Sequence, residues 1–163
     1  DFWDQSLLGE AEEYDNLVIL KTCSKAVGLA NIRLGFAVAN ERITDALRAV
    51  KSPYNVNGVS AMIGAAVLEQ RDYLREAAAE LVASRHALSR ELESLLSRKA
   101  GAYRIYPSHT NFLYVSMPDA GAVFAGLKER GIIVRCLGSH LRITAGSEAE
   151  NAALTAALDG ILV

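Results

Sequence analysis

The sequence has little cysteine, proline and tryptophan, and it contains no long apolar run. There are two cysteines, three prolines and one tryptophan among 163 residues. Cys23 and Cys136 are too few for a disulfide framework and lie in no zinc-like spacing, so we expect small core or loop residues and no metal site. No apolar run approaches the roughly 18 residues that span a bilayer, and no signal peptide opens the chain. We therefore expect a cytoplasmic protein that has no membrane partner.

An excess of charge of one sign is also missing. Seventeen lysines and arginines are interleaved with nineteen acidic residues, which gives a net charge of −2. This pattern leaves no basic face large enough for nucleic acid. A composition of 51% hydrophobic and 22% charged residues is ordinary for a globular protein, and the length allows one good core or two small ones.

The most informative stretch is residues 21–33, which lies between two apolar runs. The runs Leu17–Leu20 and Leu34–Ala39 are short and unbroken, so we expect two buried strands joined by a loop of small residues. If the strands lie side by side, the end of the first comes close to the start of the second. The loop would then gather polar side chains at one point.

Four residues of this stretch predict a site for a phosphate-bearing cofactor. The hydroxyls of Thr22 and Ser24 and the guanidinium of Arg33 suit phosphate. Lys25 lies at the rim, where desolvation and a neighbouring cation would favour a neutral amine that forms a Schiff base with an aldehyde. A solvated lysine and a surface arginine explain the spacing equally well. A Ser24-Lys25 hydrolytic dyad is disfavoured, because neighbours on an extended chain point to opposite faces.

The remaining pattern predicts helices and short strands in a small α/β domain with helices on one face of an open sheet. Asn40, Asp119 and the pair Ser147 and Glu150 are expected to cap helices. We expect helices from Asn40 to Ser52 and over 60–70, 72–99, 119–128 and 149–162, and strands over 103–106, 112–115, 132–134 and 141–144. His86 is expected to be exposed, and His140 to lie in a loop.

Arg142 lies in an apolar strand without an acidic residue nearby in the sequence. A charge in that position needs a partner. An anionic ligand or a distant carboxylate of the fold would serve equally well.

The run T-x-S-K-A-x-G-L-A-x-x-R-x-G resembles the lysine segment of fold-type I aminotransferases, in particular the histidinol-phosphate aminotransferase family and the related threonine-phosphate decarboxylases. The resemblance implies that Lys25 carries pyridoxal 5'-phosphate and that Ser24 and Arg33 bind its phosphate, with Thr22 close by. Asn31 departs from the family, which usually has glycine there. The implied fold class is α/β: part of the large-domain sheet of a pyridoxal-phosphate transferase over 1–52, a connecting segment over 53–72 and a small C-terminal α/β domain over 73–163.

The run L-R-I-T-A-G resembles the family's strand whose arginine binds the substrate carboxylate, which assigns that role to Arg142. Arg135 matches a second arginine that faces the phosphate end of the substrate. The resemblance further implies a homodimer, an amino donor and a 2-oxo acid as substrates, and Lys25 as general base and then acid. Because the family's D-E-A-Y segment would come before Asp1, we expect a fragment of roughly the C-terminal half.

Three functions stay open from the sequence. The first is an aminotransferase acting on an amino acid or an amino alcohol phosphate similar to histidinol phosphate. The second is a decarboxylase of the threonine-phosphate type. The third, of another class, is an inert folded fragment or an interaction module, and we expect the 163 residues by themselves to be inactive.

Overall fold

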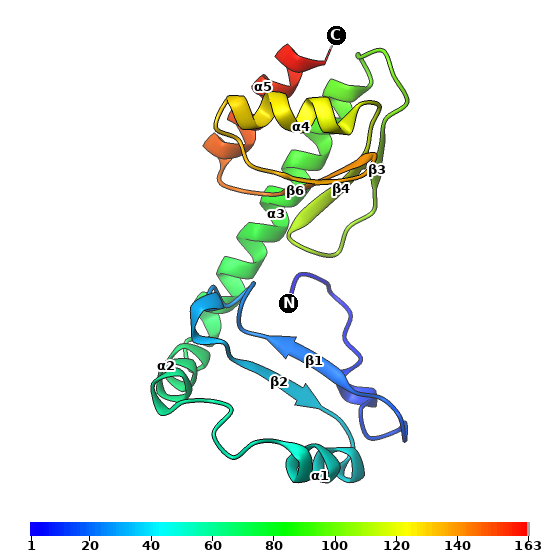
Figure 1. Ribbon diagram of the computed structural model, residues 1–163. Coiled ribbons are helices and arrows are strands. Elements are labelled where there is room, and N and C mark those ends of the chain that lie inside the picture. The colour runs from blue at the N-terminus through cyan, green and yellow to red at the C-terminus, as the bar shows by residue number, and fades with distance from the viewer. Residues whose placement is uncertain (163) are drawn as a thin grey trace. The chain divides into compact units, whose positions relative to one another are not determined.

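The computed structural model describes residues 1–162 and divides the chain into two compact units (Figure 1). The first unit comprises Asp1 and Trp3–Ala78, and the second comprises Phe2 and the residues from Ala79 onward. The elements of the first unit are η1 (Leu8–Glu10), β1 (Ile19–Thr22), η2 (Ala30–Ile32), β2 (Gly35–Val38), α1 (Glu41–Val50), α2 (Gly58–Leu68) and the start of α3 (Arg71–Leu96).

β1 and β2 form an antiparallel pair in which Thr22 lies opposite Gly35. The prediction that the two apolar runs are neighbouring strands is therefore confirmed. The prediction that both are buried is wrong, since Leu20 is 77% exposed and Phe36 is 45% exposed. A sheet of two strands is too small to bury its own faces, and the described part of the chain does not cover these side chains.

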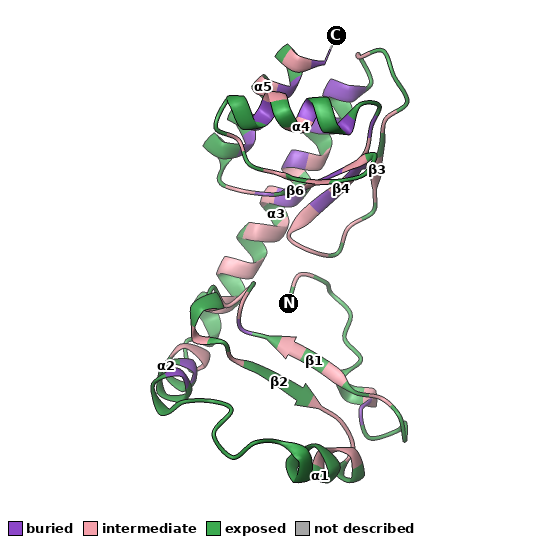
Figure 2. Ribbon diagram, viewed as in Figure 1, coloured by how far each residue is buried: buried purple, intermediate pink, exposed green. Residues whose placement is uncertain are grey.

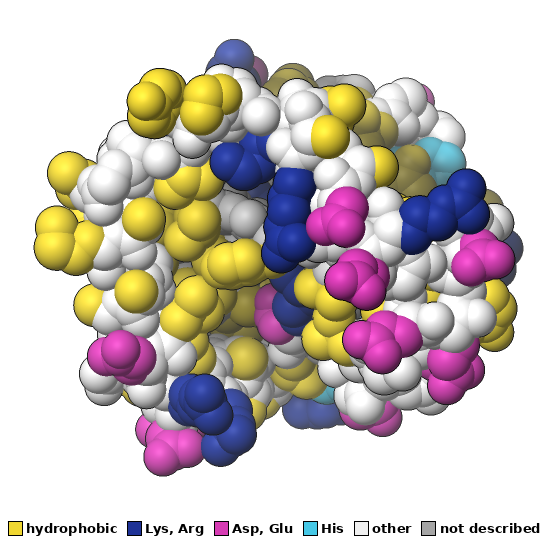
Figure 3. Space-filling model, turned by 90° about the horizontal axis from the view of Figure 1, so that it is seen from below, with side chains coloured by type: hydrophobic (Ala, Val, Ile, Leu, Met, Phe, Trp, Pro, Cys, Tyr) yellow, Lys and Arg dark blue, Asp and Glu magenta, His cyan; other side chains and the backbone are white. Residues whose placement is uncertain are grey.

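Large exposed hydrophobic side chains are concentrated in the first unit. Figure 3 shows many of them on the face seen from below, and Figure 2 shows most of α1 and most of α2 as exposed. They include Trp3, Leu7, Tyr14, Leu20, Phe36, Val50, Tyr54, Val59, Met62 and Tyr73. None of the helices within residues 1–162 is both long enough and apolar enough to cross a membrane.

The second unit is built on a four-stranded antiparallel sheet with the strand order β3-β4-β6-β5. Its strands are β3 (Arg104–Tyr106), β4 (Phe112–Ser116), β5 (Arg135–Leu137) and β6 (His140–Thr144), and its helices are the rest of α3, α4 (Ala120–Glu129) and α5 (Glu148–Ile161). Figure 1 shows α4 and α5 on the same side of this sheet.

The core of the second unit lies between this sheet and the helices. Leu113 and Val115 of β4 and Leu141 and Ile143 of β6 are buried at alternate positions, because successive side chains of a strand point to opposite faces. They pack with buried leucines of all three helices, among them Leu88, Leu92, Leu127, Leu154 and Leu158. The predicted open sheet with helices on one face is thus confirmed.

The strand predicted over 132–134 is wrong. The backbone N–H of Ile132 still donates to the carbonyl of Leu127, 2.9 Å away at the end of α4, and residues 132–134 form neither a helix nor a strand. The strand begins three residues later, and a two-residue turn joins it to β6 with Leu137 opposite His140. Gly138 supplies the positive φ, +64°, that such a tight hairpin requires.

Most of the predicted helix signals are confirmed, whereas one of the two histidine predictions is wrong. Asn40 accepts a hydrogen bond from the Ile43 N–H at 3.0 Å, and Ser147 forms a full capping box with Glu150. The predicted cap at Asp119 is wrong, because its side chain makes no capping hydrogen bond to α4. α3 spans 71–96 against the predicted 72–99, and His86 is exposed as expected. His140 lies in β6 and not in a loop, because it pairs across the hairpin turn.

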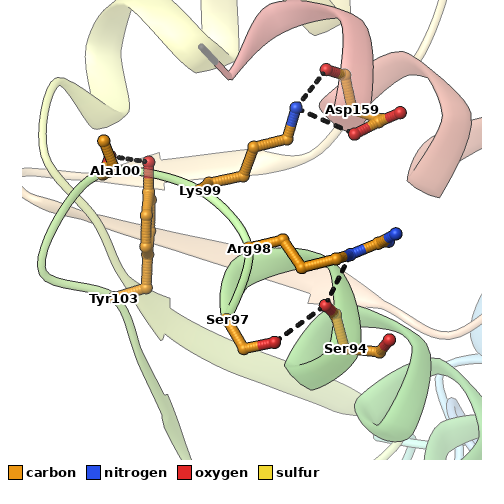
Figure 4. Close-up of polar contacts among 7 residues, drawn as sticks. All are labelled: Ser94, Ser97, Arg98, Lys99, Ala100, Tyr103 and Asp159. Carbon is orange, nitrogen blue, oxygen red and sulfur yellow. Dashed lines mark hydrogen bonds and ion pairs between the residues drawn. The ribbon is translucent and has the colours of Figure 1, made fainter.

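Lys99, just after α3, is linked to α5 through Asp159. Its Nζ lies 2.8 Å from the Asp159 carboxylate and donates to the Asp159 carbonyl at 2.9 Å (Figure 4). Tyr103 donates to the carbonyl of Ala100 at 3.0 Å in the same region. The lysine thereby connects the end of one helix to the last turn of another.

This contact predicts an acid-sensitive contribution to stability. The hydrogen bond from Lys99, followed by the charge of Lys99, lowers the pKa of Asp159 below its ordinary value of 3.8. A carboxyl whose pKa is lowered on folding stabilises the fold above its unfolded pKa, and this stabilisation is lost as the pH falls through the folded pKa. Denaturant unfolding between pH 6 and 2 should therefore show a smaller acid-induced loss in Asp159→Asn than in the wild type. Parallel curves for the two proteins would contradict this assignment.

Candidate functional site

The predicted lysine loop is a closed turn between β1 and β2. The Cys23 N–H donates to the Leu34 carbonyl at 3.1 Å, and the Leu29 N–H donates to the Cys23 carbonyl at 2.8 Å. Inside this ring the Gly28 N–H donates to the Lys25 carbonyl at 2.9 Å, and Gly28 has the left-handed φ of +73° that favours glycine. The glycine of the S-K-A-x-G run therefore has a conformational role, and the turn presents Lys25 from a backbone that is tied at both ends.

The structure places all four predicted residues of this loop on the same turn or beside it. The Thr22 hydroxyl accepts from the Ser24 N–H at 3.1 Å. Arg33 adopts a left-handed backbone with φ of 54° and donates from its guanidinium to the Ala30 carbonyl at 2.8 Å. Neither Lys25 nor Arg33 belongs to any of the four ion pairs found among residues 1–162. The turn thus combines two cations and two hydroxyls without a carboxylate partner.

The desolvation expected at Lys25 is not provided by the described residues, because Lys25 is exposed. A cavity of about 270 Å³ does lie next to this turn. Thr22, Cys23, Phe36 and Val38 are among its lining residues, but Lys25 is not. Cys23 is 2% exposed and packs there as the small core residue that the sequence predicted.

The two predicted substrate arginines are direct neighbours in the second unit. Arg135 of β5 and Arg142 of β6 are cross-strand partners, so their side chains leave the same face of the sheet. Arg142 is also the partner of Tyr114, which in turn pairs with Tyr106. A row of two tyrosines and two arginines therefore crosses all four strands. Like charges directly opposite each other are destabilising, and an anion between them would remove that repulsion.

Arg142 lacks an acidic partner. Its Nε is buried and has no hydrogen-bond acceptor within residues 1–162, and its Cζ lies 5.0 Å from the centre of the Phe112 ring. None of the four ion pairs in the described chain includes it. The alternative of a distant carboxylate is thus not found in the described residues. A buried donor of a charged group calls for an acceptor, which favours an anionic ligand.

An aromatic cluster on the same face was missed by the sequence reasoning. His140 stacks on Tyr114 with ring centres 4.6 Å apart and planes within 5°, and Tyr106 lies 5.6 Å from Tyr114. Arg104 lies over the Tyr106 ring at 4.6 Å. The signal was available, because the turn Gly138-Ser139 predicts a hairpin that places His140 on the same face as Arg142.

Comparison with known proteins identifies the chain's relatives. A family model described as aminotransferase class I and II matches residues 1–158. The histidinol-phosphate aminotransferase of Thermoanaerobacter sp. (strain X514) is 42% identical over an alignment of 153 residues, which covers 90% of this chain and 42% of that relative. The chain thus spans less than half the length of this relative.

Solved structures show the same fold. The histidinol-phosphate aminotransferase from Clostridium acetobutylicum matches with a TM-score of 0.84 and 22% identity, over 96% of this chain and 48% of that one. L-threonine-O-3-phosphate decarboxylase from Porphyromonas gingivalis matches with a TM-score of 0.69 and 22% identity, over 94% and 49%. At these identities the likeness concerns the fold alone. The family model covers nearly the whole chain, and the protein therefore belongs to the aminotransferase class I and II family.

Proposed function

We propose that this chain is the C-terminal part of a pyridoxal-phosphate-dependent aminotransferase. The enzyme would move an amino group between an amino acid or amino alcohol phosphate, similar to histidinol phosphate, and a 2-oxo acid. The observation that carries the proposal is Lys25, presented by a closed turn without a carboxylate partner in a chain of this family. The 42% identity to a histidinol-phosphate aminotransferase supports the substrate class.

The donors of the lysine turn suit the cofactor chemically. Phosphate is recognised by a guanidinium and by hydroxyl donors, which Arg33, Ser24 and Thr22 offer on or beside the turn that carries Lys25. We assign the cofactor's phosphate to these three residues and its aldehyde to the Lys25 amine. When bound, pyridoxal phosphate supplies an electron sink for the carbanion formed at the substrate's α-carbon.

Lys25 and the two arginines have separate tasks in this proposal. The Lys25 Nζ removes the α-proton of the substrate as a general base and then returns a proton as a general acid. Arg142 binds the carboxylate of the amino acid or 2-oxo acid through its guanidinium, and Arg135 binds the phosphate of an amino alcohol phosphate. Fixing the ends of the substrate orients the bond that is broken, which lowers the entropic part of the barrier.

The assignment of Lys25 predicts the position of a chemical label. The family-length protein that carries this chain is incubated with pyridoxal phosphate and reduced with borohydride, and its peptides are mapped by mass spectrometry. We expect a pyridoxyl group on Lys25 and none on Lys21, which lies on the same segment and pairs with Asp1. A label on another lysine, or no label with the cofactor in excess, would refute the proposal.

The decarboxylase is distinguished by the product. Its structural likeness to this chain concerns the fold, whereas the aminotransferase is supported by sequence identity as well. With phosphothreonine as substrate, release of carbon dioxide without amino-group transfer would favour the decarboxylase. Amino-group transfer from an amino alcohol phosphate to a 2-oxo acid would favour the aminotransferase.

We further propose a cytoplasmic homodimer, as the family resemblance implies. The large hydrophobic side chains exposed on the first unit support an association of this kind, because contiguous exposed apolar surface marks interaction sites. Sedimentation of the family-length protein is expected to give twice the mass of one chain. A monomer at micromolar concentration would contradict the dimer without affecting the assignment of Lys25.

A further inference from the structure

The guanidinium of Arg142 rests on an aromatic ring. Its Cζ lies 5.0 Å from the centre of the Phe112 ring, within the range of a cation–π contact. Phe112 is one strand away in β4, where it pairs with Thr144, so it reaches Arg142 diagonally across the sheet. A guanidinium held over a ring has fewer orientations open to it, and this restricts the direction of its N–H groups. The buried Nε is one of these groups.

The backbone of Phe112 is itself held by several hydrogen bonds. The hydroxyls of Ser108 and Thr110 both donate to the Phe112 carbonyl, at 2.6 and 3.2 Å. The Ala145 N–H, just after β6, donates to the Asn111 carbonyl at 3.0 Å. The first residue of β4 is therefore fixed from the preceding loop and from the neighbouring strand.

A buried cation secures that loop. Arg85 of α3 is 4% exposed and donates from Nη1 to the Thr110 carbonyl at 2.8 Å. Its Nη2 lies 2.9 Å from the His86 Nε2, which accepts the hydrogen bond because a guanidinium only donates. Arg85 belongs to none of the four ion pairs within residues 1–162. A buried charge without an acidic partner is unfavourable by itself. Because Arg85 is buried and donates to the Thr110 carbonyl, we infer that it serves to hold this loop in place.

We propose that Phe112 is the positioning residue of Arg142: its ring, seated by the loop that Arg85 holds, sets the direction in which the Arg142 guanidinium meets the acid end of the substrate. The inference rests on the proposed role of Arg142 in binding the substrate. It assigns to Phe112 an effect on substrate affinity and no part in the proton transfer. Phe112 therefore influences the reaction through Arg142 alone.

Steady-state kinetics of the family-length enzyme test the inference. In Phe112→Leu we expect the KM for the 2-oxo acid to rise about tenfold, a factor between those of an exposed and a desolvated cation–π contact, while kcat stays within about twofold. Phe112→Tyr keeps a ring under Arg142 and should restore the KM. Phe124→Leu, the same change in a residue of α4 that packs against the core, is the matched control and should leave the KM unchanged. An unchanged KM in Phe112→Leu would overturn the inference.

A binding measurement separates this inference from the proposed function. In the 163-residue chain, the NMR signal of the Arg142 Nε–H is identified by its loss in Arg142→Lys and followed during titration with succinate. We expect a saturable shift in the wild type and a weaker one in Phe112→Leu. Equal titrations in both would refute the role of Phe112 even if the enzyme transaminates. A family-length enzyme without transamination, combined with different titrations, would instead refute the proposed function and leave the positioning role intact.

Discussion

Replacing Lys25 by alanine is expected to remove amino-group transfer from the family-length enzyme. Loss of a positioned general acid–base alone lowers a rate by about 10²- to 10⁴-fold, and Lys25→Ala also removes the amine that we assign to the cofactor's aldehyde. We therefore expect kcat to fall by at least about 10³-fold. Formation of the oxo product from an amino alcohol phosphate measures the effect.

Lys21→Ala is the matched control for this prediction. Lys21 lies four positions earlier, and its ion pair with Asp1 is partly exposed, with side-chain exposures of 34% and 38%. Exposed ion pairs contribute little to stability, so this variant should keep a kcat within about twofold of the wild type. Equal losses in the two variants would mean that the whole segment, and not the amine at position 25, is required.

Exogenous methylamine offers a second test of the role of Lys25. A small amine that enters the space left by the side chain can take up the proton in place of Nζ. An increase in the activity of Lys25→Ala with methylamine, without an increase in the wild type, would assign the proton transfer to the amine. Retention of full activity in Lys25→Ala without any added amine would refute that assignment.

Local chemical signals in the sequence predicted the helices well. Asn40 and Ser147 cap helices through contacts three residues away, so everything the cap needs is present in a window of four residues. α3 was predicted within three residues because its apolar stripe repeats over seven turns. In these cases the sequence contains both partners of the interaction.

The errors arose where apolar composition alone was used to predict a strand or its burial. Residues 132–134 have the β-branched composition of a strand. The Ile132 N–H nevertheless donates a hydrogen bond to the Leu127 carbonyl, and the pairing with β6 begins at Arg135. Leu20 and Phe36 were expected to be buried because their runs are apolar. An apolar run predicts side chains that favour burial, but it does not predict whether other residues of the chain bury them.

The residues of the candidate site could be predicted together only where they are close in the sequence. The four residues of the lysine loop are close in sequence, and one closed turn holds them. Arg135 and Arg142 were identified one by one from their resemblance to family arginines. Strand register determines their pairing across the hairpin and the contact of Phe112 with Arg142. Short strands specify this register weakly in sequence.

The second large effect is expected on stability, from Leu127→Ala. Leu127 of α4 is 0% exposed and belongs to the core cluster between the helices and the sheet. Deleting its side chain removes buried apolar contacts and leaves a cavity, a combination that lowers the free energy of unfolding by about 2–5 kcal/mol. Amide hydrogen exchange of β4 and β6 should therefore speed up by about 30-fold to several thousandfold.

Leu20→Ala is the control, because it deletes the same atoms from a side chain that is 77% exposed. There the change in unfolding free energy should stay within about 0.5 kcal/mol. Exchange of the β4 and β6 amides follows the second unit directly, whereas the single tryptophan, Trp3, belongs to the first. Equal losses of protection in the two variants would show that the apolar cluster around Leu127 does not hold the second unit together. The same sheet carries Arg135, Arg142 and Phe112. A Leu127→Ala protein that stays folded at low temperature should therefore also bind succinate less tightly as it is warmed.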